Sequence, residues 1–313
     1  MVIHYVICEE EAMEIRTLEY FLAVAREENM TEAANTLHIT QPTLSRQIAD
    51  LEQELGKQLF IRTNRNTKLT EDGIHLRQRA EEILSLVRQT EAEISDDQTD
   101  LTGCIRLGAG ETRIAHFLTD AFTDLHLQHP QVTCNLFTGN ADIVEEKLSH
   151  GLIDFGLFID PFDASGFESI ALPERDQVGI ITKSDSPWSH YKTITPEIIA
   201  DMPLLVSSRR TTHAFDFDSW SGGTLKQEDL NIVGSFDLIG NASLLIKGGL
   251  TNAMAMSGLY QQQDNDITYV PLEPARYLSC VVAWKKYQLL SRASEAFLNC
   301  LKKQVDEYKK ANP

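Results

Sequence analysis

The chain has 313 residues, of which 42% are hydrophobic and 24% are charged. This composition excludes a disordered protein, and the length allows two or three domains with cores of their own. The formal net charge of −18 excludes a generally basic surface, so binding to nucleic acid would have to rely on a local basic segment. The five cysteines are scattered without a C-x-x-C motif, which favours a reducing compartment.

Residues 1–12 contain a seven-residue apolar stretch, Val2 to Cys8, followed by three glutamates. The stretch is too short to cross a bilayer, and it lacks the basic residues and the length of a signal peptide. We therefore expect a cytoplasmic location and no membrane partner.

Three helices are predicted between residues 14 and 55. Apolar residues recur at helical spacing in residues 14–27, and the small pair Ala33-Ala34 allows a second helix to pack closely. The third helix has a stripe of apolar residues at steps of four and three, namely Leu44, Ile48, Leu51 and Leu55. Ile39 is expected to fill the space between the second and third helices.

Thr40 is the predicted N-cap of the third helix, and Pro42 lies in its first turn, where no backbone N–H is needed. The outward face of this helix offers amide, hydroxyl and guanidinium groups, which can read base edges in the major groove. The candidate DNA-binding residues here are Thr40, Gln41, Pro42, Thr43, Ser45 and Arg46. A helical hairpin with an ordinary polar surface is the alternative interpretation.

After Gly56 ends the third helix, residues 57–69 contain basic residues and no acidic one. Two short strands around a turn at residues 64–66 are predicted. Such a basic hairpin, or wing, contacts phosphates or the minor groove. Its candidate DNA-binding residues are Arg62, Arg65 and Lys68.

Residues 13 to about 94 resemble the N-terminal region of LysR-type transcriptional regulators. The matching motifs are Leu18-x-x-Phe21, Ala33-Ala34 to Leu37, Thr40-Gln41-Pro42 to Leu44-Ser45-Arg46-Gln47-Ile48, Leu51-Glu52, Leu55-Gly56, Leu59-Phe60-x-Arg62 and Leu69-Thr70-x-x-Gly73. The resemblance implies that the third helix enters the major groove and that Arg65 lies near the minor groove. We expect a sequence-specific transcription regulator that binds an interrupted palindrome in double-stranded DNA as a homodimer or homotetramer, with RNA polymerase as a further candidate partner.

Thr70 is the predicted cap of a long helix with an apolar stripe at Leu76, Ala80, Ile83, Val87, Thr90 and Ile94. This stripe has no other obvious partner in the chain, so residues 71–95 are expected to pair with a second copy. An amphipathic helix lying on its own domain is the alternative. Because the resemblance begins at Met13, residues 1–12 are expected to be an N-terminal extension, with a misassigned start as the alternative. The predicted domains are this extension (1–12), a winged helix-turn-helix domain (13–70), a linker helix and hinge (71–100) and an effector-binding domain (101–313).

From Cys104 onward, short apolar segments alternate with helical ones, which predicts α/β structure with a parallel sheet covered by helices. The chain is expected to cross between two lobes near Arg175–Val178 and to return near Thr268–Glu273. Lobe 1 then comprises about 104–176 and 272–313, and lobe 2 about 177–271. The family resemblance implies the same two-lobe plan, which is similar to that of periplasmic binding proteins.

Ligands of open α/β sheets bind at the carboxyl ends of strands, near helix N-termini. Three such ends supply the candidate effector-binding residues, which are Gly110, Glu111, Thr112, Thr138, Gly139, Asn140, Ser207, Ser208 and Arg209. Simple helix capping is the alternative role of Thr138 and Ser207. Glu111 would repel an acid unless Arg113 or Arg209 offsets it, so the sequence favours an effector that is neutral or carries an amine.

Motifs of catalysis are missing from the sequence, which has no P-loop, no G-x-S-x-G and no H-E-x-x-H. Gly108-Ala109-Gly110 lacks the third glycine of a dinucleotide-binding motif, and His126-x-x-His129 is also typical of a solvated helix face. We therefore predict no enzyme activity, no metal and no cofactor. A solute-binding protein and an α/β enzyme are the rival interpretations.

Overall fold

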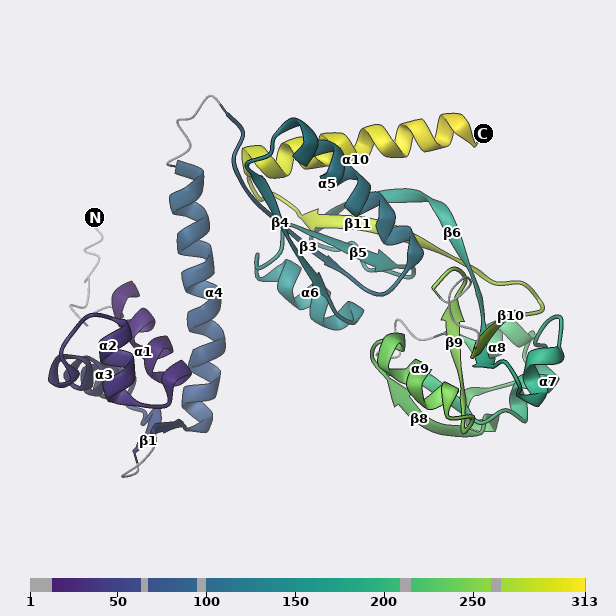
Figure 1. Cartoon of the computed structure of the whole chain (residues 1–313), viewed down its shortest axis with the longest axis horizontal. Coiled ribbons are helices and arrows are strands. Elements are labelled where there is room, and N and C mark those ends of the chain that lie inside the picture. Colours follow the sequence, from purple (N-terminus) through teal and green to yellow (C-terminus); the bar gives the residue numbers. More distant parts are fainter. Residues whose placement is uncertain (1–12, 63–66, 95–99, 209–214, 260–265, 313) are drawn as a thin grey trace, which may run out of the picture. The chain divides into compact units, whose positions relative to one another are not determined.

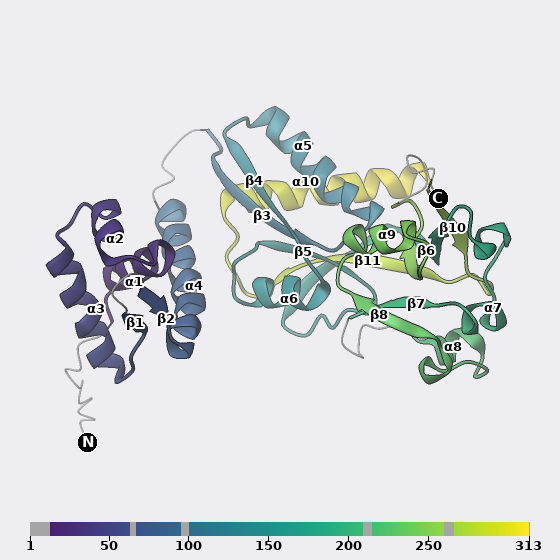
Figure 2. The ribbon, with the colours of Figure 1, turned by 60° about the horizontal axis from the view of Figure 1, so that its bottom comes forward.

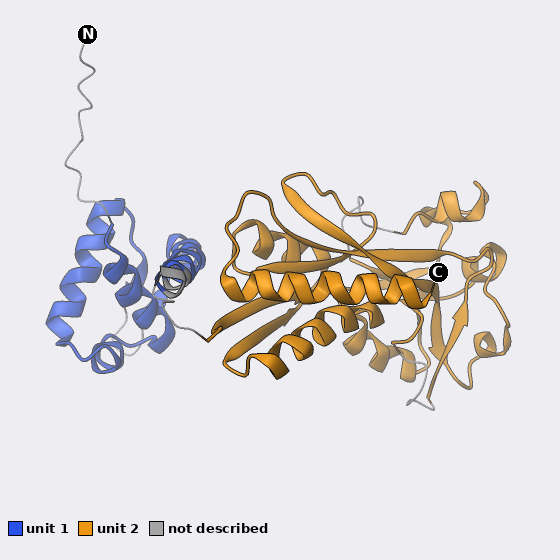
Figure 3. Cartoon of the chain, turned by 90° about the horizontal axis from the view of Figure 1, so that it is seen from above, with its two compact units in different colours: residues 1–95 blue, residues 96–313 orange. Residues whose placement is uncertain are grey.

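The structure is a computed structural model that describes residues 13–62, 67–94, 100–208, 215–259 and 266–312. The chain forms two compact units, residues 1–95 and residues 96–313 (Figure 3). Within the described ranges, none of the helices has both the length and the apolar character needed to span a membrane.

In unit 1, residues 1–95, the described residues form three short helices, a two-stranded hairpin and one long helix (Figure 1). Its elements are α1 (Ile15–Glu27), α2 (Met30–Thr36), α3 (Gln41–Leu55), β1 (Phe60–Arg62), β2 (Thr67–Leu69) and α4 (Glu71–Ile94). The predicted helices and strands of the winged helix-turn-helix are therefore confirmed. The predicted turn at 64–66 lies outside the described residues.

The core of unit 1 joins the helices to the hairpin. The ring centroids of Phe21 on α1 and Phe60 on β1 lie 5.2 Å apart, so the first strand is anchored to the first helix. The predicted stripe of α3 is buried at Leu44, Ile48 and Leu51, whereas Leu55 is 39% exposed. This corrects the prediction for Leu55, which is the last residue of α3, directly before the left-handed cap at Gly56.

One face of α4 packs on its own unit. Ala80 and Leu84 are buried in the same core as α1, and Leu76 packs against that core. This corrects the prediction that Leu76 and Ala80 belong to a seam between two copies. Ile83 and Leu86 are 37% and 53% exposed, so apolar surface is free further along the helix.

Lobe 1 of unit 2 contains one end of a nine-stranded sheet. Its strands are β3 (Gly103–Ala109), β4 (Val132–Thr138), β5 (Phe155–Ile159), β11 (Tyr277–Lys285) and the first part of β6 (Phe167–Lys183). β3 is parallel to β4 and β5, whereas β11 is antiparallel to β5 and β6. Figure 2 shows α5 (His116–Gln128) and α10 (Arg292–Ala311) on one side of these strands and α6 (Ala141–Ser149) on the other.

Lobe 2 contains the other end of the sheet. Its strands are β7 (Leu204–Ser207), β8 (Ile232–Phe236), β9 (Asn252–Met256), β10 (Ile267–Pro271) and the second part of β6. β7 is parallel to β8 and β9, whereas β6 is antiparallel to β9 and β10. The short helices α7 (Pro196–Ala200) and α8 (Phe217–Ser221) pack in one apolar cluster, and α9 (Ile239–Lys247) packs in a second one.

β6 connects the two lobes. Its residues up to Gln177 pair with β11, and its residues from Val178 onward pair with β9 and β10. The predicted crossing near Arg175–Val178 coincides with this change of partners. The return lies at residues 272–276, where the Val178 N–H donates to the Arg276 carbonyl at 2.8 Å. The predicted return, Thr268–Glu273, starts too early because residues up to Pro271 still belong to β10.

Several elements of unit 2 were not predicted, and the sheet is mixed rather than wholly parallel. The missed elements are the first part of β6, β8, β9 and α8. Pro173 argues against a strand, but it lies where the register of β6 against β11 shifts, so its missing N–H is tolerated. β9 has the sequence Asn-Ala-Met-Ala-Met, which lacks β-branched residues and becomes a strand through its pairing with β6 and β7.

Candidate functional site

The first turn of α3 is held by Thr40. Its hydroxyl oxygen accepts from the Thr43 N–H at 3.4 Å and lies 2.8 Å from the Thr43 hydroxyl oxygen. Pro42 lies in this first turn and needs no hydrogen-bond acceptor for its nitrogen. Because Leu44 and Ile48 face the core, the side chains that point to solvent at this end of the helix are those of Gln41, Pro42, Thr43 and Arg46.

Arg46 extends from this exposed face. Its side chain is 84% exposed, and its Nε lies 3.8 Å from a carboxylate oxygen of Asp50, which is itself 60% exposed. Such a pair contributes about 0.2–1 kcal/mol, so the guanidinium can exchange Asp50 for an external acceptor. Ser45, the remaining candidate on α3, is half-buried. The face therefore combines an amide, hydroxyls and an exposed guanidinium.

The hairpin that follows α3 is tied to both neighbouring helices. A carboxylate oxygen of Glu52 on α3 accepts from the N–H groups of Leu59 and Phe60 at 2.7 and 3.1 Å. The hydroxyl of Thr70, which caps α4, donates to the Gln58 carbonyl at 2.7 Å. These contacts fix the position of the hairpin relative to the exposed face of α3.

The cations of the hairpin are described in part. Lys68 lies on β2 opposite Ile61 and is exposed to solvent. Arg62 is the last residue of β1. Arg65 lies outside the described residues. Lys68 thus offers an exposed ammonium group on the wing, as expected for contact with a phosphate.

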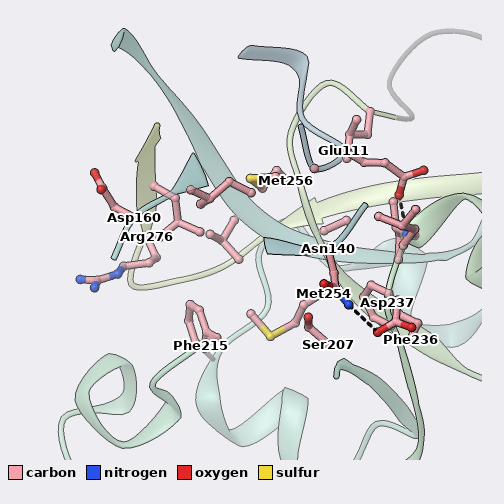
Figure 4. A pocket seen from close by; sticks show the side chains of 18 of the residues that line it. Glu111, Asn140, Asp160, Ser207, Phe215, Phe236, Asp237, Met254, Met256 and Arg276 are labelled. Carbon is pink, nitrogen blue, oxygen red and sulfur yellow. Dashed lines mark hydrogen bonds between the residues drawn. The ribbon is translucent and has the colours of Figure 1, made fainter. Parts of the chain in front are cut away.

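A cavity of about 350 Å³ in unit 2 is lined by residues of both lobes. Its walls are largely apolar, with Phe215, Phe236, Met254 and Met256 among the lining side chains (Figure 4). The size and the mixture of apolar walls with a few polar groups are typical of a site for a small molecule.

Five candidate effector-binding residues line this cavity, namely Gly110, Glu111, Gly139, Asn140 and Ser207. Ser208 lies next to it, because its hydroxyl donates to the carboxylate of the lining residue Asp237. Thr138 is an exposed residue at the end of β4 and is not part of the lining, which corrects its assignment. Arg209 lies outside the described residues.

Thr112 is buried and is not part of the lining either. Its hydroxyl oxygen accepts from the Ile114 N–H at 3.1 Å, and the hydroxyl donates to the Asp176 carboxylate at 2.9 Å. This corrects the prediction that Thr112 contacts the effector. Its actual role is to cap the short 3-10 helix Arg113–Ala115 and to fasten it to β6.

Glu111 caps a helix of the opposite lobe. Its Oε2 accepts from the Ile239 N–H at 2.5 Å (Figure 4) and from the Gly240 N–H at 3.2 Å. These are the first residues of α9, whose own N-cap residue, Leu238, makes no side-chain cap. The carboxylate of lobe 1 therefore stabilises a helix of lobe 2 and holds the two lobes together.

Asn140 makes a second contact between the lobes. Its Oδ1 caps α6 by accepting from the Ile143 N–H at 3.0 Å, and its Nδ2 donates to Asp237 at 3.2 Å. The hydrogen bond from Ser208, followed by that from Asn140, lowers the pKa of Asp237. The carboxylate of Asp237 is therefore charged at neutral pH.

Arg113 does not offset the negative charge of Glu111, because its guanidinium pairs with two other carboxylates. Its guanidinium lies 2.6 Å from Glu174 and 3.3 Å from Asp176, and His116 Nε2 lies 2.8 Å from Glu174. Burial alone would raise the pKa of Glu174, but the hydrogen bonds from His116 and Arg113 lower it overall. Burial raises the pKa of Asp176 despite its hydrogen bonds.

The lining residues that sequence reasoning missed come mainly from lobe 2 and from the return segment. They include Phe215, Phe236, Asp237, Met254 and Arg276. Recognition of β8 would have placed Phe236 and Asp237 at the carboxyl end of a strand, which is the signal that identified the other candidates.

Two family models match the sequence. Residues 15–74 match the model described as bacterial regulatory helix-turn-helix protein, lysR family. Residues 98–306 match the model described as LysR substrate binding domain.

Similar proteins and structures agree with these models. The HTH-type transcriptional regulator YofA of Bacillus velezensis is 32% identical over 166 residues, which span 53% of this chain and 57% of YofA. The uncharacterised HTH-type transcriptional regulator YvbU of Bacillus subtilis is 26% identical over 294 residues, which span 93% of this chain and 98% of YvbU. The crystal structure of full-length CbnR with its target DNA has the same fold, with a TM-score of 0.70 and 21% identity over 93% of this chain and 99% of CbnR. Since the substrate-binding model alone covers more than half of the sequence, the chain belongs to the LysR family of bacterial helix-turn-helix transcription regulators.

Proposed function

We propose that α3 and the β1–β2 hairpin bind operator DNA and that a small molecule in the cavity of unit 2 modulates transcription. The observation that carries the DNA-binding part is the exposed row of Gln41, Thr43 and Arg46 on a helix fixed by the Thr40 cap. The cavity lined by both lobes supports the effector part, because a ligand there can change how the lobes pack.

The candidate side chains of unit 1 that can contact DNA fall into groups with different chemistry. Arg46 and Gln41 read base edges, because a guanidinium suits guanine and an amide suits adenine. Thr43 and Ser45 supply hydroxyls to bases or phosphates. Lys68, like Arg62 and Arg65 of the same hairpin, acts mainly on the backbone or the minor groove.

Pairing of two copies through α4 follows from the apolar surface that this helix leaves uncovered. Ile83 and Leu86 are exposed, whereas the face of the helix that carries Ala80 and Leu84 is buried in the core of its own unit. A two-fold pair presents two copies of α3, which fits an interrupted palindrome. Pairing of the effector domains, to give a tetramer, rests on the family resemblance.

The proposal places the protein in the cytoplasm, where chromosomal DNA lies, and gives it no catalytic step. In the described part of the chain, His, Cys, Asp and Glu residues do not form a group that could hold a metal ion. Regulation then depends on binding alone.

The test measures binding to the DNA that flanks the protein's own gene and to a shuffled copy of that DNA, by fluorescence anisotropy at several salt concentrations. Arg46→Ala should weaken binding to the flanking DNA by about 1–3 kcal/mol and reduce the preference over the shuffled copy. Lys302→Ala, which removes an exposed cation of α10, is the matched control and should leave both affinities unchanged. Equal affinity of the wild type for the two DNA molecules would refute the proposal.

A further inference from the structure

The N-terminus of α9 contributes to the cavity wall, because Leu238 and Ile239 are lining residues. The free N–H groups of a helix start and the helix dipole together attract anions. An acidic ligand in this cavity would therefore be expected to place its carboxylate at the start of α9.

That position is already filled by a side chain of the protein. Glu111 accepts from the N–H groups of both Ile239 and Gly240. A Cβ atom at position 240 would lie 2.9 Å from Glu111 Oε1, so the absence of a side chain at Gly240 leaves room for the carboxylate. The start of α9 is thus shaped around an internal carboxylate.

The other helix starts near the cavity are capped as well. Asn140 caps α6 through the Ile143 N–H at 3.0 Å, and Asp216 caps α8 through the Ser219 N–H at 3.0 Å. Both capping residues line the cavity. Among the described helices that contribute to its wall, each one therefore has a side-chain acceptor at its N-terminus.

The charges of the described lining residues also disfavour an acidic ligand. Four of the described lining residues carry carboxylates, namely Glu111, Asp160, Asp216 and Asp237, whereas one, Arg276, carries a guanidinium. Within the described part of the chain, the side chain of Asp160 makes no hydrogen bond, and both hydrogen bonds of Asp237 go to Oδ1. Acceptor oxygens are therefore available to a ligand that donates hydrogen bonds.

The apolar walls define the rest of the ligand. Phe215 and Phe236 supply aromatic rings, and Met254 and Met256 supply polarizable thioethers. Aromatic faces attract cations, and methionine adapts to irregular apolar groups. We infer that the Glu111 carboxylate takes the place at the N-terminus of α9 that an anionic ligand would otherwise occupy. The cavity therefore selects a cationic amine with an apolar body and rejects carboxylates. This inference rests on the proposed effector role of the cavity.

The test uses two probes that share a phenyl ring and a two-carbon chain, 2-phenylethylammonium and 3-phenylpropionate, titrated calorimetrically into the full-length protein. The wild type should bind the amine at least about tenfold more tightly than the carboxylate, which corresponds to about 1.4 kcal/mol. Glu111→Ala frees the start of α9 and should raise the affinity for 3-phenylpropionate by about tenfold or more. The matched control, Glu228→Ala, removes an exposed glutamate outside the lining and should behave like the wild type.

Glu111→Gln is the control for misfolding of the alanine variant, because the glutamine amide oxygen can still accept from the N–H groups of α9 while the charge is lost. It should melt near the wild-type temperature and show a weaker preference for the amine. Equal binding of the two probes to the wild type would overturn the inference, as would no binding of either probe or no gain of carboxylate affinity in Glu111→Ala. Operator binding without ligand does not depend on these variants, so a failure here leaves the proposed DNA-binding function standing.

Discussion

The Thr112 hydroxyl donates to the Asp176 carboxylate with 2.9 Å between the oxygens. Asp176 is fully buried and pairs with β11, two residues before β6 begins to pair with the strands of lobe 2. Glu111 directly precedes Thr112 and reaches across to α9. The bond therefore anchors the interlobe contact of Glu111 to the strand that connects the lobes.

Thr112→Val should destabilise unit 2 by about 1–3 kcal/mol, because the buried carboxylate of Asp176 loses a donor. Valine keeps the shape of the side chain but can neither donate to Asp176 nor cap the Ile114 N–H. The measurement is the midpoint of urea denaturation followed by circular dichroism.

Thr138→Val is the control for this prediction. Thr138 was assigned to the effector site by the same sequence argument, but its side chain is exposed at the end of β4. Its replacement should change the stability by less than about 0.5 kcal/mol. A loss as large as that of Thr112→Val would show that the hydrogen bond to Asp176 is not the cause.

Glu174→Gln should destabilise the protein at pH 7 by about 1 kcal/mol, because Arg113 and His116 lose a charged partner. The folded state lowers the pKa of Glu174, whose ordinary value is 4.5. A lowered carboxyl pKa contributes stability above the unfolded value, and this contribution is lost as the pH falls through the folded value. The difference in the free energy of unfolding between wild type and variant should therefore be largest at pH 7 and shrink below about pH 4.5.

The same urea titrations at pH 7 and at pH 4 provide the measurement. Glu228→Gln, which changes an exposed glutamate of lobe 2, should match the wild type at both pH values. If the destabilisation caused by Glu174→Gln grew as the pH is lowered, the lowered pKa of Glu174 would not be its cause.

Leu86→Asp should dissociate the proposed pair of copies without unfolding unit 1, since Leu86 is 53% exposed in the single chain. A charge at an apolar contact between copies would lose its hydration without gaining a partner. Sedimentation at micromolar concentration should show a monomer, with helical content unchanged by circular dichroism.

Ile74→Asp is the matched control on the same helix. Ile74 is also 53% exposed, but it is nine positions from Ile83 and twelve from Leu86, which places it about 180° and about 120° around the axis from these two residues. It should leave the oligomeric state unchanged. Dissociation by Ile74→Asp, with Leu86→Asp still paired, would move the interface to the other side of α4.

Local signals explain why unit 1 could be predicted closely. Thr40 and Gly56 mark the start and end of α3, and the spacing of Leu44 and Ile48 defines its buried face. The sequence could not show which side of α4 faces its own unit. The stripe at Leu76 is equally compatible with packing inside the unit and with packing between copies.

The candidate effector site could be predicted only in part, because its contacts join distant segments. The carboxylate of Glu111 meets the Ile239 N–H, 128 positions away. From sequence, Glu111 was placed at the mouth of the cavity, where its charge would repel an acidic effector. Its role as the cap of α9 could not be predicted, because the start of α9 has no local capping signature. Asp237 was missed for a related reason, because β8 before it is half exposed and resembles a loop.

Lys68→Ala should weaken binding to every DNA sequence by a similar factor, in contrast to Arg46→Ala. Lys68 is exposed on β2 of the wing, where an ammonium group acts on phosphate as a point charge and carries little sequence information. Loss of one phosphate contact releases one fewer counterion, so the slope of log affinity against log salt should become smaller by about one. The measurement is anisotropy with flanking and shuffled DNA at four salt concentrations, and Lys302→Ala should keep the wild-type slope. A slope unchanged in Lys68→Ala would show that the wing lysine does not reach the phosphates.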